Sequence, residues 1–143
     1  MKSNISPQEY SKIIESIELN DIVLIESALK VADLESSGGT ISLNLSDKYI
    51  FKENDNKVSF YATFKLLGKK DNSDSKDSIF TITAKYKISY FKPNELVITN
   101  DFFDVFKELS LSMLIWPYMR EFIQNNLNRA GLPPLTLPLK KIC

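Results

Sequence analysis

Residues 100–139 read NDFFDVFKELSLSMLIWPYMREFIQNNLNRAGLPPLTLPL, and this stretch decides the fold. Its apolar residues recur at alternating steps of four and three, which is one face of a helix: Phe102, Phe106, Leu109, Met113 and Trp116. Pro117 lacks a backbone N–H and clashes with the preceding turn, so the helix is expected to kink or restart there. A second amphipathic run follows, and Gly131 is suited to end it. The stretch predicts a kinked helix at about 101–130 and an extended apolar tail at 132–139.

The first residues of the chain carry the signature of a helix start. Ser6 fits the N-cap, Pro7 fits the first helical position, and Glu9 completes a capping box. These residues predict a short helix at about 6–16. The opening sequence MKSNISPQEY has no apolar core like that of a signal peptide, so we expect no secretory leader.

Apolar and polar residues alternate with a period of two between about residues 18 and 92, which predicts four strands. The clearest apolar faces lie at 58–66 and 80–90. Within 41–51 the alternation is interrupted by Asp47-Lys48, so two short strands or one irregular strand would fit.

The connections between these strands are rich in turn residues and polar residues. Ser36-Ser37-Gly38-Gly39 and Glu53-Asn54-Asp55-Asn56 predict turns, and the polar stretch 68–78 predicts a long hairpin loop. Successive strands with short connections predict an antiparallel meander with one apolar face covered by the C-terminal helix. The predicted class is therefore α+β, a four-stranded antiparallel sheet packed against a long kinked C-terminal helix, in a single domain spanning 1–143.

Composition limits the functions that this chain can have. A chain of 143 residues can bury a core as one domain. Its 18 basic and 18 acidic residues balance, which gives no electrostatic reason to expect nucleic acid or a membrane surface as a partner. No run is long and apolar enough for membrane insertion. The single cysteine, Cys143, cannot form an intrachain disulfide, which favours a cytoplasmic protein.

The residues that usually carry chemistry are scarce. The chain has no histidine, and one cysteine cannot build a zinc cluster. Asp71, Asp74 and Asp77 are spaced three apart, but they lie in a lysine-containing polar loop and are interpreted as solvated charges. We therefore expect no enzyme, no catalytic residue, no metal and no cofactor.

Two strings in the C-terminal third resemble a known family. Ile115–Glu121, IWPYMRE, resembles the FPYARE segment of the SecB protein-export chaperones. Asn128–Leu137, NRAGLPPLTL, is similar to that family's NRGGFPQLxL loop, at the same separation. The resemblance implies a homotetramer, a dimer of dimers, that holds unfolded or non-native polypeptides without ATP or metal. It also implies a role in protein export together with SecA.

The resemblance places a peptide-binding groove beside the loop that follows the long helix. The residues that it implicates in this chain are Trp116, Tyr118, Phe122, Leu132, Leu135 and Leu137. The proline-spaced tail cannot form a helix or a central strand. From the residues alone, this tail either borders a groove or covers the core of its own domain, and both interpretations stay open.

Some features differ from the export chaperones. The net charge is zero where those proteins are strongly acidic, the chain ends at Cys143 where they continue, and the helix at 6–16 is not typical of them. These differences point to a SecB-like paralogue, either stand-alone or dedicated to a client such as a toxin–antitoxin pair. SecA docking uses acidic residues on the sheet surface of the export proteins.

Two further expectations concern the surface. A sheet backed by one helix leaves apolar side chains uncovered, which predicts self-association to a dimer at least; the side chains expected there are Ile22, Leu24, Ile50, Tyr61 and Phe91. Rival functions are a structural interaction domain with a closed groove and a hot-dog-like thioesterase. The thioesterase would need a carboxylate or histidine positioned on the helix to face a pocket, and Glu108 or Glu121 alone gives this function little support.

Overall fold

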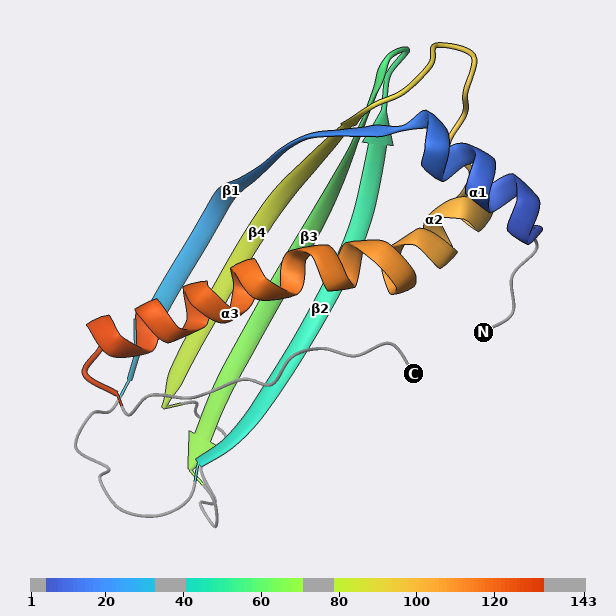
Figure 1. The fold of residues 1–143 in the computed structure, drawn as a ribbon. Helices are drawn as coiled ribbons and strands as arrows, with labels where there is room; N and C mark the ends of the chain where they lie inside the picture. Colours follow the sequence, from blue (N-terminus) through green and yellow to red (C-terminus); the bar gives the residue numbers. More distant parts are fainter. Residues whose placement is uncertain (1–4, 33–40, 71–78, 133–143) are drawn as a thin grey trace.

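The computed structural model describes residues 5–32, 41–70 and 79–132. One sheet and one layer of helices make up the described fold (Figure 1). The strands are β1 (Glu18–Val31), β2 (Ile41–Glu53), β3 (Lys57–Lys70) and β4 (Phe80–Phe91). The helices are α1 (Pro7–Ser16), α2 (Asn100–Phe106) and α3 (Ser112–Arg129), and a π-helical turn at Lys107–Leu111 joins α2 to α3. The predicted α+β class, an antiparallel sheet with a long C-terminal helix, is confirmed.

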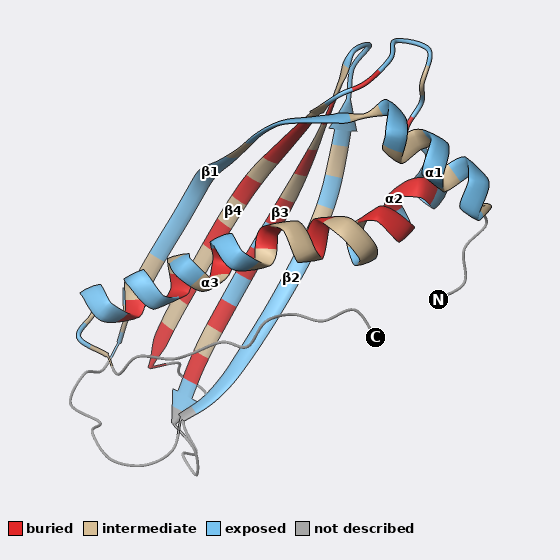
Figure 2. Cartoon of the chain, in the orientation of Figure 1, coloured by how far each residue is buried: buried red, intermediate tan, exposed pale blue. Residues whose placement is uncertain are grey.

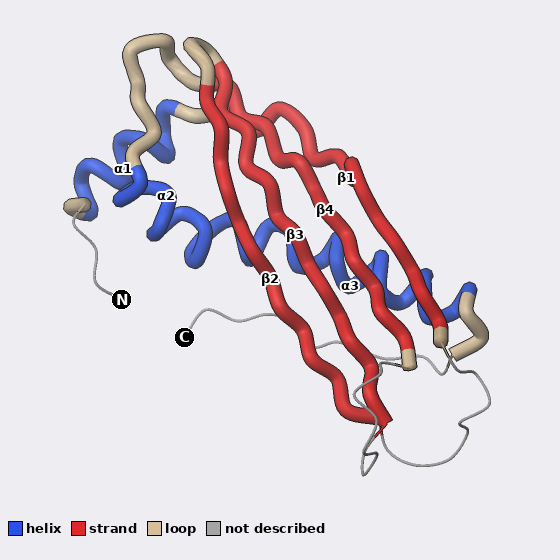
Figure 3. Tube along the Cα trace, turned by 180° about the vertical axis from the view of Figure 1, so that it is seen from behind, coloured by secondary structure: helices blue, strands red, loops and turns tan. Residues whose placement is uncertain are grey.

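The order of strands in the sheet is β1-β4-β3-β2, and every neighbouring pair is antiparallel (Figure 3). Strands β2, β3 and β4 follow one another as neighbours, but β1 pairs with β4 at the far edge. Glu18 lies opposite Phe91, and Val31 lies opposite Phe80. The predicted meander is therefore wrong. Alternation reveals which face of a strand is buried, but it carries no information about which strand is the neighbour.

Two local predictions within the strands also need correction. Strand β2 is continuous, and its register with β3 has no shift at Asp47 or Lys48, so it is neither two strands nor an irregular one. Strand β3 extends to Lys70, so Gly68 lies in the sheet rather than in a loop. A Cβ atom at Gly68 would overlap the ring of Phe80, its cross-strand neighbour, and this close approach explains the glycine.

The central strands β3 and β4 build the sheet side of the core. Alternate residues are buried along both strands, where red bands alternate with tan or pale blue ones in Figure 2, and the faces predicted at 58–66 and 80–90 are confirmed. Leu24, Ile50 and Phe91 are exposed as predicted. Ile22 instead packs partly buried against the core, and Tyr61 is half-buried, so those two expectations were wrong.

The buried face of the long helix shifts at the π-helical turn. Phe102 and Phe106 are buried, but the next buried positions after the turn are Leu111, Ser112 and Ile115, followed by Met119, Ile123 and Leu127. A π-helical turn accommodates one extra residue, so the step from Phe106 to Leu111 is five rather than four. Leu109, Met113 and Trp116 are consequently only half-buried, so the prediction that they share one buried face with Phe102 and Phe106 was wrong. The helix continues through Pro117 instead of restarting there.

The helix ends follow the expected capping chemistry. The Ser6 side chain accepts a hydrogen bond from the Glu9 N–H at 3.1 Å, and Thr99 caps α2 in the same way. At the other end Gly131 has a φ of 71°. The Gly131 N–H donates to the Asn128 carbonyl, and the Leu132 N–H donates to the Leu127 carbonyl. These two bonds form a Schellman motif, which ends the helix at the predicted place.

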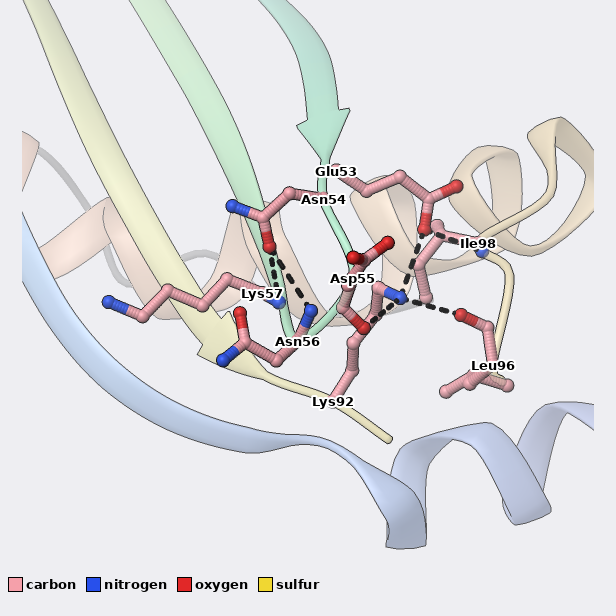
Figure 4. Close-up of polar contacts among 8 residues, drawn as sticks. All are labelled: Glu53, Asn54, Asp55, Asn56, Lys57, Lys92, Leu96 and Ile98. Atoms are coloured by element: carbon pink, nitrogen blue, oxygen red, sulfur yellow. Dashed lines mark hydrogen bonds and ion pairs between the residues drawn. The ribbon is translucent and has the colours of Figure 1, made fainter. Parts of the chain in front are cut away.

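A buried lysine connects the β2–β3 turn to the segment that leads into α2 (Figure 4). The Lys92 ammonium group donates to the carbonyls of Asp55 and Leu96 at 3.1 and 2.7 Å, and it lies 3.6 Å from a Glu53 carboxylate oxygen. The same oxygen accepts the Ile98 N–H at 3.1 Å. Because all of these groups meet at Lys92, the start of the long helix is held at a fixed place on the sheet.

Candidate functional site

An apolar pocket lies between α3 and the sheet. It encloses about 180 Å³, counting the part that is open to solvent. Its walls come from three strands and the helix: Leu45 on β2, Phe64 and Leu66 on β3, Ile82 and Ala84 on β4, and Met119, Phe122 and Ile123 on α3. The room that it leaves for a water-sized molecule is only about 10 Å³, which is about enough for one water. It is therefore a shallow apolar depression and not a cavity that holds a metabolite or a whole side chain.

The sheet side of this pocket is a cross-strand row. Leu45 lies opposite Leu66, and Leu66 lies opposite Ile82. Leu66 and Ile82 are buried, whereas Leu45 on the edge strand β2 is 37% exposed. Leu43, two residues further along β2, is 41% exposed. The pocket is therefore continuous with an exposed apolar strip on the edge strand.

The helix side of the pocket includes one of the predicted groove residues. Phe122 lines the pocket and is half-buried. Tyr118, one turn earlier, is 47% exposed, and its ring lies 6.4 Å from the ring of Tyr86. The Tyr86 hydroxyl donates to the Tyr118 carbonyl at 3.3 Å. Burial, and to a smaller extent the charge of Glu121, raises the pKa of Tyr86, which keeps this hydroxyl protonated as a donor.

Trp116 lies on a different flank of the same helix. At about 100° per residue, Trp116 and Phe122 are about 120° apart around the helix axis. Trp116 packs half-buried against the core and does not line this pocket. The three aromatic residues grouped by the sequence are thus divided by the structure: Tyr118 and Phe122 share one flank, and Trp116 does not.

Leu132 follows the Schellman motif and packs partly buried against the core. Its role as a groove residue stays a prediction. Leu135 and Leu137, with the remainder of the tail, lie outside the described residues, as do Asp71, Asp74, Asp77 and the turn at 36–39.

The sheet residues of the pocket were missed by the sequence reasoning. Leu43 and Leu45 belong to the alternation predicted at 41–51, but the predicted meander placed that strand inside the sheet, so nothing marked it as an edge. Met119 and Ile123 belong to the buried face of α3. Their contact with Leu45 depends on where α3 crosses the sheet, which local patterns do not show.

The described residues offer little for catalysis. Within residues 5–32, 41–70 and 79–132, no group of three or more acidic or cysteine side chains is placed to hold a metal ion. Glu108 and Glu121 are exposed, and neither lines the pocket. None of the helices in the described ranges is long and apolar enough to cross a membrane.

The structure is similar to those of SecB-like chaperones. It matches the SecB-like chaperone Rv1957 of Mycobacterium tuberculosis, solved in complex with a ChAD peptide from the HigA1 antitoxin Rv1956, with a TM-score of 0.81 and 15% identity. The match covers 93% of this chain and 96% of that one. A protein of unknown function from Streptococcus agalactiae matches with a TM-score of 0.45 and 13% identity, over 85% of this chain and 96% of that one.

The SecB-like fold of this chain is thereby shown, and the resemblance seen in residues 115–137 is confirmed at the level of the fold. No protein-family model matches the sequence, and no curated protein matches it.

Proposed function

We propose that this protein is an ATP-independent chaperone of the holdase type, which binds extended or non-native polypeptide through its apolar pocket. The observation that carries the proposal is a shallow depression lined by eight apolar side chains and continuous with exposed Leu43 and Leu45 on the edge strand, on a SecB-like fold. A site of this kind recognises apolarity rather than a defined chemical group, which suits a protein with many clients.

The surroundings of the pocket support the binding of a chain rather than of an isolated side chain. Strand β2 is an edge of the sheet, so its outer backbone groups are free of a strand neighbour within the described sheet. An extended client can pair with this edge and lay alternate side chains over the apolar depression. Leu43, Leu45 and Tyr118 add exposed apolar surface, which is worth about 25 cal/mol per Å² when a client covers it.

A pair of matched substitutions on β2 tests this proposal. Leu45 and Ile50 are 37% and 42% exposed, but Leu45 lies opposite buried Leu66 on the helix face, whereas Ile50 lies opposite Tyr61 on the other face. We expect Leu45→Ser to weaken the suppression of client aggregation about tenfold, since it removes about 1.4 kcal/mol of apolar contact. Ile50→Ser should leave suppression unchanged.

The measurement is light scattering of a chemically denatured apolar client at increasing chaperone ratios, with the melting temperature of each variant recorded alongside. Equal loss of activity in both variants would mean that the pocket is not the client site. If the wild-type protein does not suppress aggregation at a stoichiometric ratio, the holdase proposal fails.

A second candidate is a binding module dedicated to one client. It is favoured by the structural neighbour, which was solved in complex with an antitoxin peptide. A dedicated module would bind one peptide tightly and leave unrelated denatured clients to aggregate, so the same assay with several clients separates the two functions. The closed-groove interpretation would make Leu45→Ser lower the melting temperature with no client binding to lose.

The proposal also covers the location, the assembly and the clients of the protein. We place the protein in the cytoplasm as a homotetramer whose clients are non-native polypeptides. A role in export with SecA has less support, because the outward positions of β2, β3 and β4 among the described residues hold lysines instead of carboxylates.

A further inference from the structure

The face of the sheet that points away from the helices is strongly basic over three of its strands. The registers of β2, β3 and β4 have no shifts, so every second residue lies on this outer face. Seven lysines occupy these outward positions: Lys48, Lys52, Lys57, Lys65, Lys69, Lys85 and Lys87. None of the described outward positions on these three strands holds aspartate or glutamate.

The lysines are close neighbours. Thr63 on β3 lies opposite Lys48 on one side and Lys85 on the other, and Lys65 is two residues further along β3. The ammonium groups of Lys52 and Lys85 both lie over the ring of Tyr61, at 5.9 and 5.4 Å from its centroid. Among the described residues of these strands, no lysine lies directly opposite another lysine, but diagonal neighbours such as Lys65 and Lys85 repel one another. A clustering that costs stability in the free protein is expected where a partner neutralises it.

The acidic residues of this face are confined to β1. Glu18, Asp21 and Glu26 lie opposite Phe91, Ser89 and Lys85 of β4, so they border the basic area on one side only. The whole chain has a net charge of zero, so the excess of lysine here is a local asymmetry and not a property of the composition. Exposed Ile50 and Phe91 lie among the lysines and offer apolar contact.

We propose that the outer face of β2, β3 and β4 is a docking surface for an acidic polypeptide segment, separate from the client pocket on the opposite side of the sheet. Carboxylates are the complement of the seven ammonium groups, and Ile50 and Phe91 suit apolar side chains interspersed with those carboxylates. Electrostatic complementarity of this kind sets the association rate and the choice of partner.

Other anionic partners fit the same face less well. Single-stranded nucleic acid is bound through rings on which bases stack, but Lys52 and Lys85 cover the ring of Tyr61, and Lys57 lies 5.3 Å from the centroid of Phe91. The described outward positions hold no arginine for phosphate recognition. A second copy of the same face would bring lysines against lysines.

The test uses a fluorescently labelled peptide of glutamate, serine and leucine with the full-length protein, and fluorescence anisotropy reports binding. We expect binding that weakens about tenfold or more when salt is raised to several times the physiological level. The double variant Lys65→Glu/Lys87→Glu should weaken binding at least about tenfold. Lys12→Glu/Lys107→Glu makes the same change of charge on the helices and should retain binding.

A second lysine variant and two other anionic ligands are also measured, so that each outcome can be interpreted. Lys65→Gln/Lys87→Gln should give an intermediate loss, and it replaces the glutamate variant if that protein does not fold. Single-stranded oligothymidine and phosphatidylserine vesicles are measured in parallel. Tighter binding of either, no peptide binding at low salt, equal loss in the helix control, or self-association that the lysine variants abolish would each overturn the proposal. Client suppression is expected to stay normal in the lysine variants, so this inference and the proposed function can fail separately.

Discussion

Lys92 and Lys107 each form an ion pair with an N–O distance of 3.6 Å, and only their surroundings differ. The Lys92 side chain is 3% exposed beside Glu53, whereas the Lys107 side chain is 35% exposed beside Asp104. We expect Lys92→Ala to lower the free energy of unfolding by about 2–4 kcal/mol, because it leaves the Glu53 carboxylate and two carbonyls without their donor.

Lys107→Ala is the control, with an expected loss of at most about 1 kcal/mol, including its contact with the Phe103 ring. Urea unfolding of both variants measures the difference. Equal losses would show that the distance between the charges, and not the burial around Lys92, decides the contribution.

Single residues were predictable where the reason for them is local. Ser6 and Gly131 act within a few residues of themselves, so their roles as helix start and stop could be predicted from the sequence. Gly68 could not be assigned to the sheet in the same way, because the ring that requires it belongs to Phe80 on another strand. The buried role of Lys92 could not be predicted from the sequence, because its partners come from the β2–β3 turn and the segment before α2.

Within the long helix, the π-helical turn at Lys107–Leu111 behaves as an insertion of one residue. Deletion of Leu109 would restore a step of four between Phe106 and Leu111 and allow a continuous α-helix with the same buried face. We expect this variant to fold with a loss of no more than about 2 kcal/mol, measured by urea unfolding with helix content followed by circular dichroism.

Deletion of Glu121, an exposed residue of α3, removes one residue from a regular helix instead. It rotates Ile115 and Met119 by about 100° relative to Ile123, so core side chains leave the core on one side of the deletion. We expect a loss of more than about 3 kcal/mol. If both deletions are equally harmful, the turn is not an insertion and serves a purpose of its own.

The elements themselves followed from periodicity, and their arrangement did not. The faces of β3 and β4 were predictable because each is buried along its full length on one side. The pairing of β1 with β4 was not, because β1 has two register irregularities, and most of its side chains are exposed, which leaves its periodicity weak. The buried face of α3 could not be predicted from spacing, because a helical wheel assumes the same rotation at every residue. The π-helical turn before α3 breaks that assumption.

For the whole molecule, the open edge at β1 favours self-association. Leu19, Val23, Leu24 and Ile25 are large apolar side chains exposed on this edge strand. We expect multi-angle light scattering to show a dimer or tetramer at micromolar concentration and Ile25→Lys to shift it towards the monomer. Val97→Lys changes a residue that is 64% exposed outside the sheet and should leave the assembly intact. A monomeric wild-type protein would contradict this prediction.

The candidate site could be predicted only on its helix side. Phe122 was assigned to a groove from the resemblance of its neighbours to SecB, and it lines the pocket. The strand residues opposite it depend on the crossing of α3 over β2, β3 and β4. That crossing is set by packing between segments far apart in the sequence, so neither periodicity nor spacing within one segment contains it.

The order of strands has a consequence for how the protein is made. Strand β1 is synthesised first, yet its only neighbour in the described sheet is β4, and Phe91, the partner of Glu18, is added about 70 residues later. At ordinary translation speeds, β1 waits roughly 4–15 s for that partner. During this time Ile22, Leu29 and Val31, which pack partly buried against the core of the folded protein, are uncovered. The last strand to leave the ribosome is also an interior one, which must enter between β3 and β1. A chain that stops before residue 80 therefore cannot form a smaller version of this sheet, and its first strand is left free to aggregate.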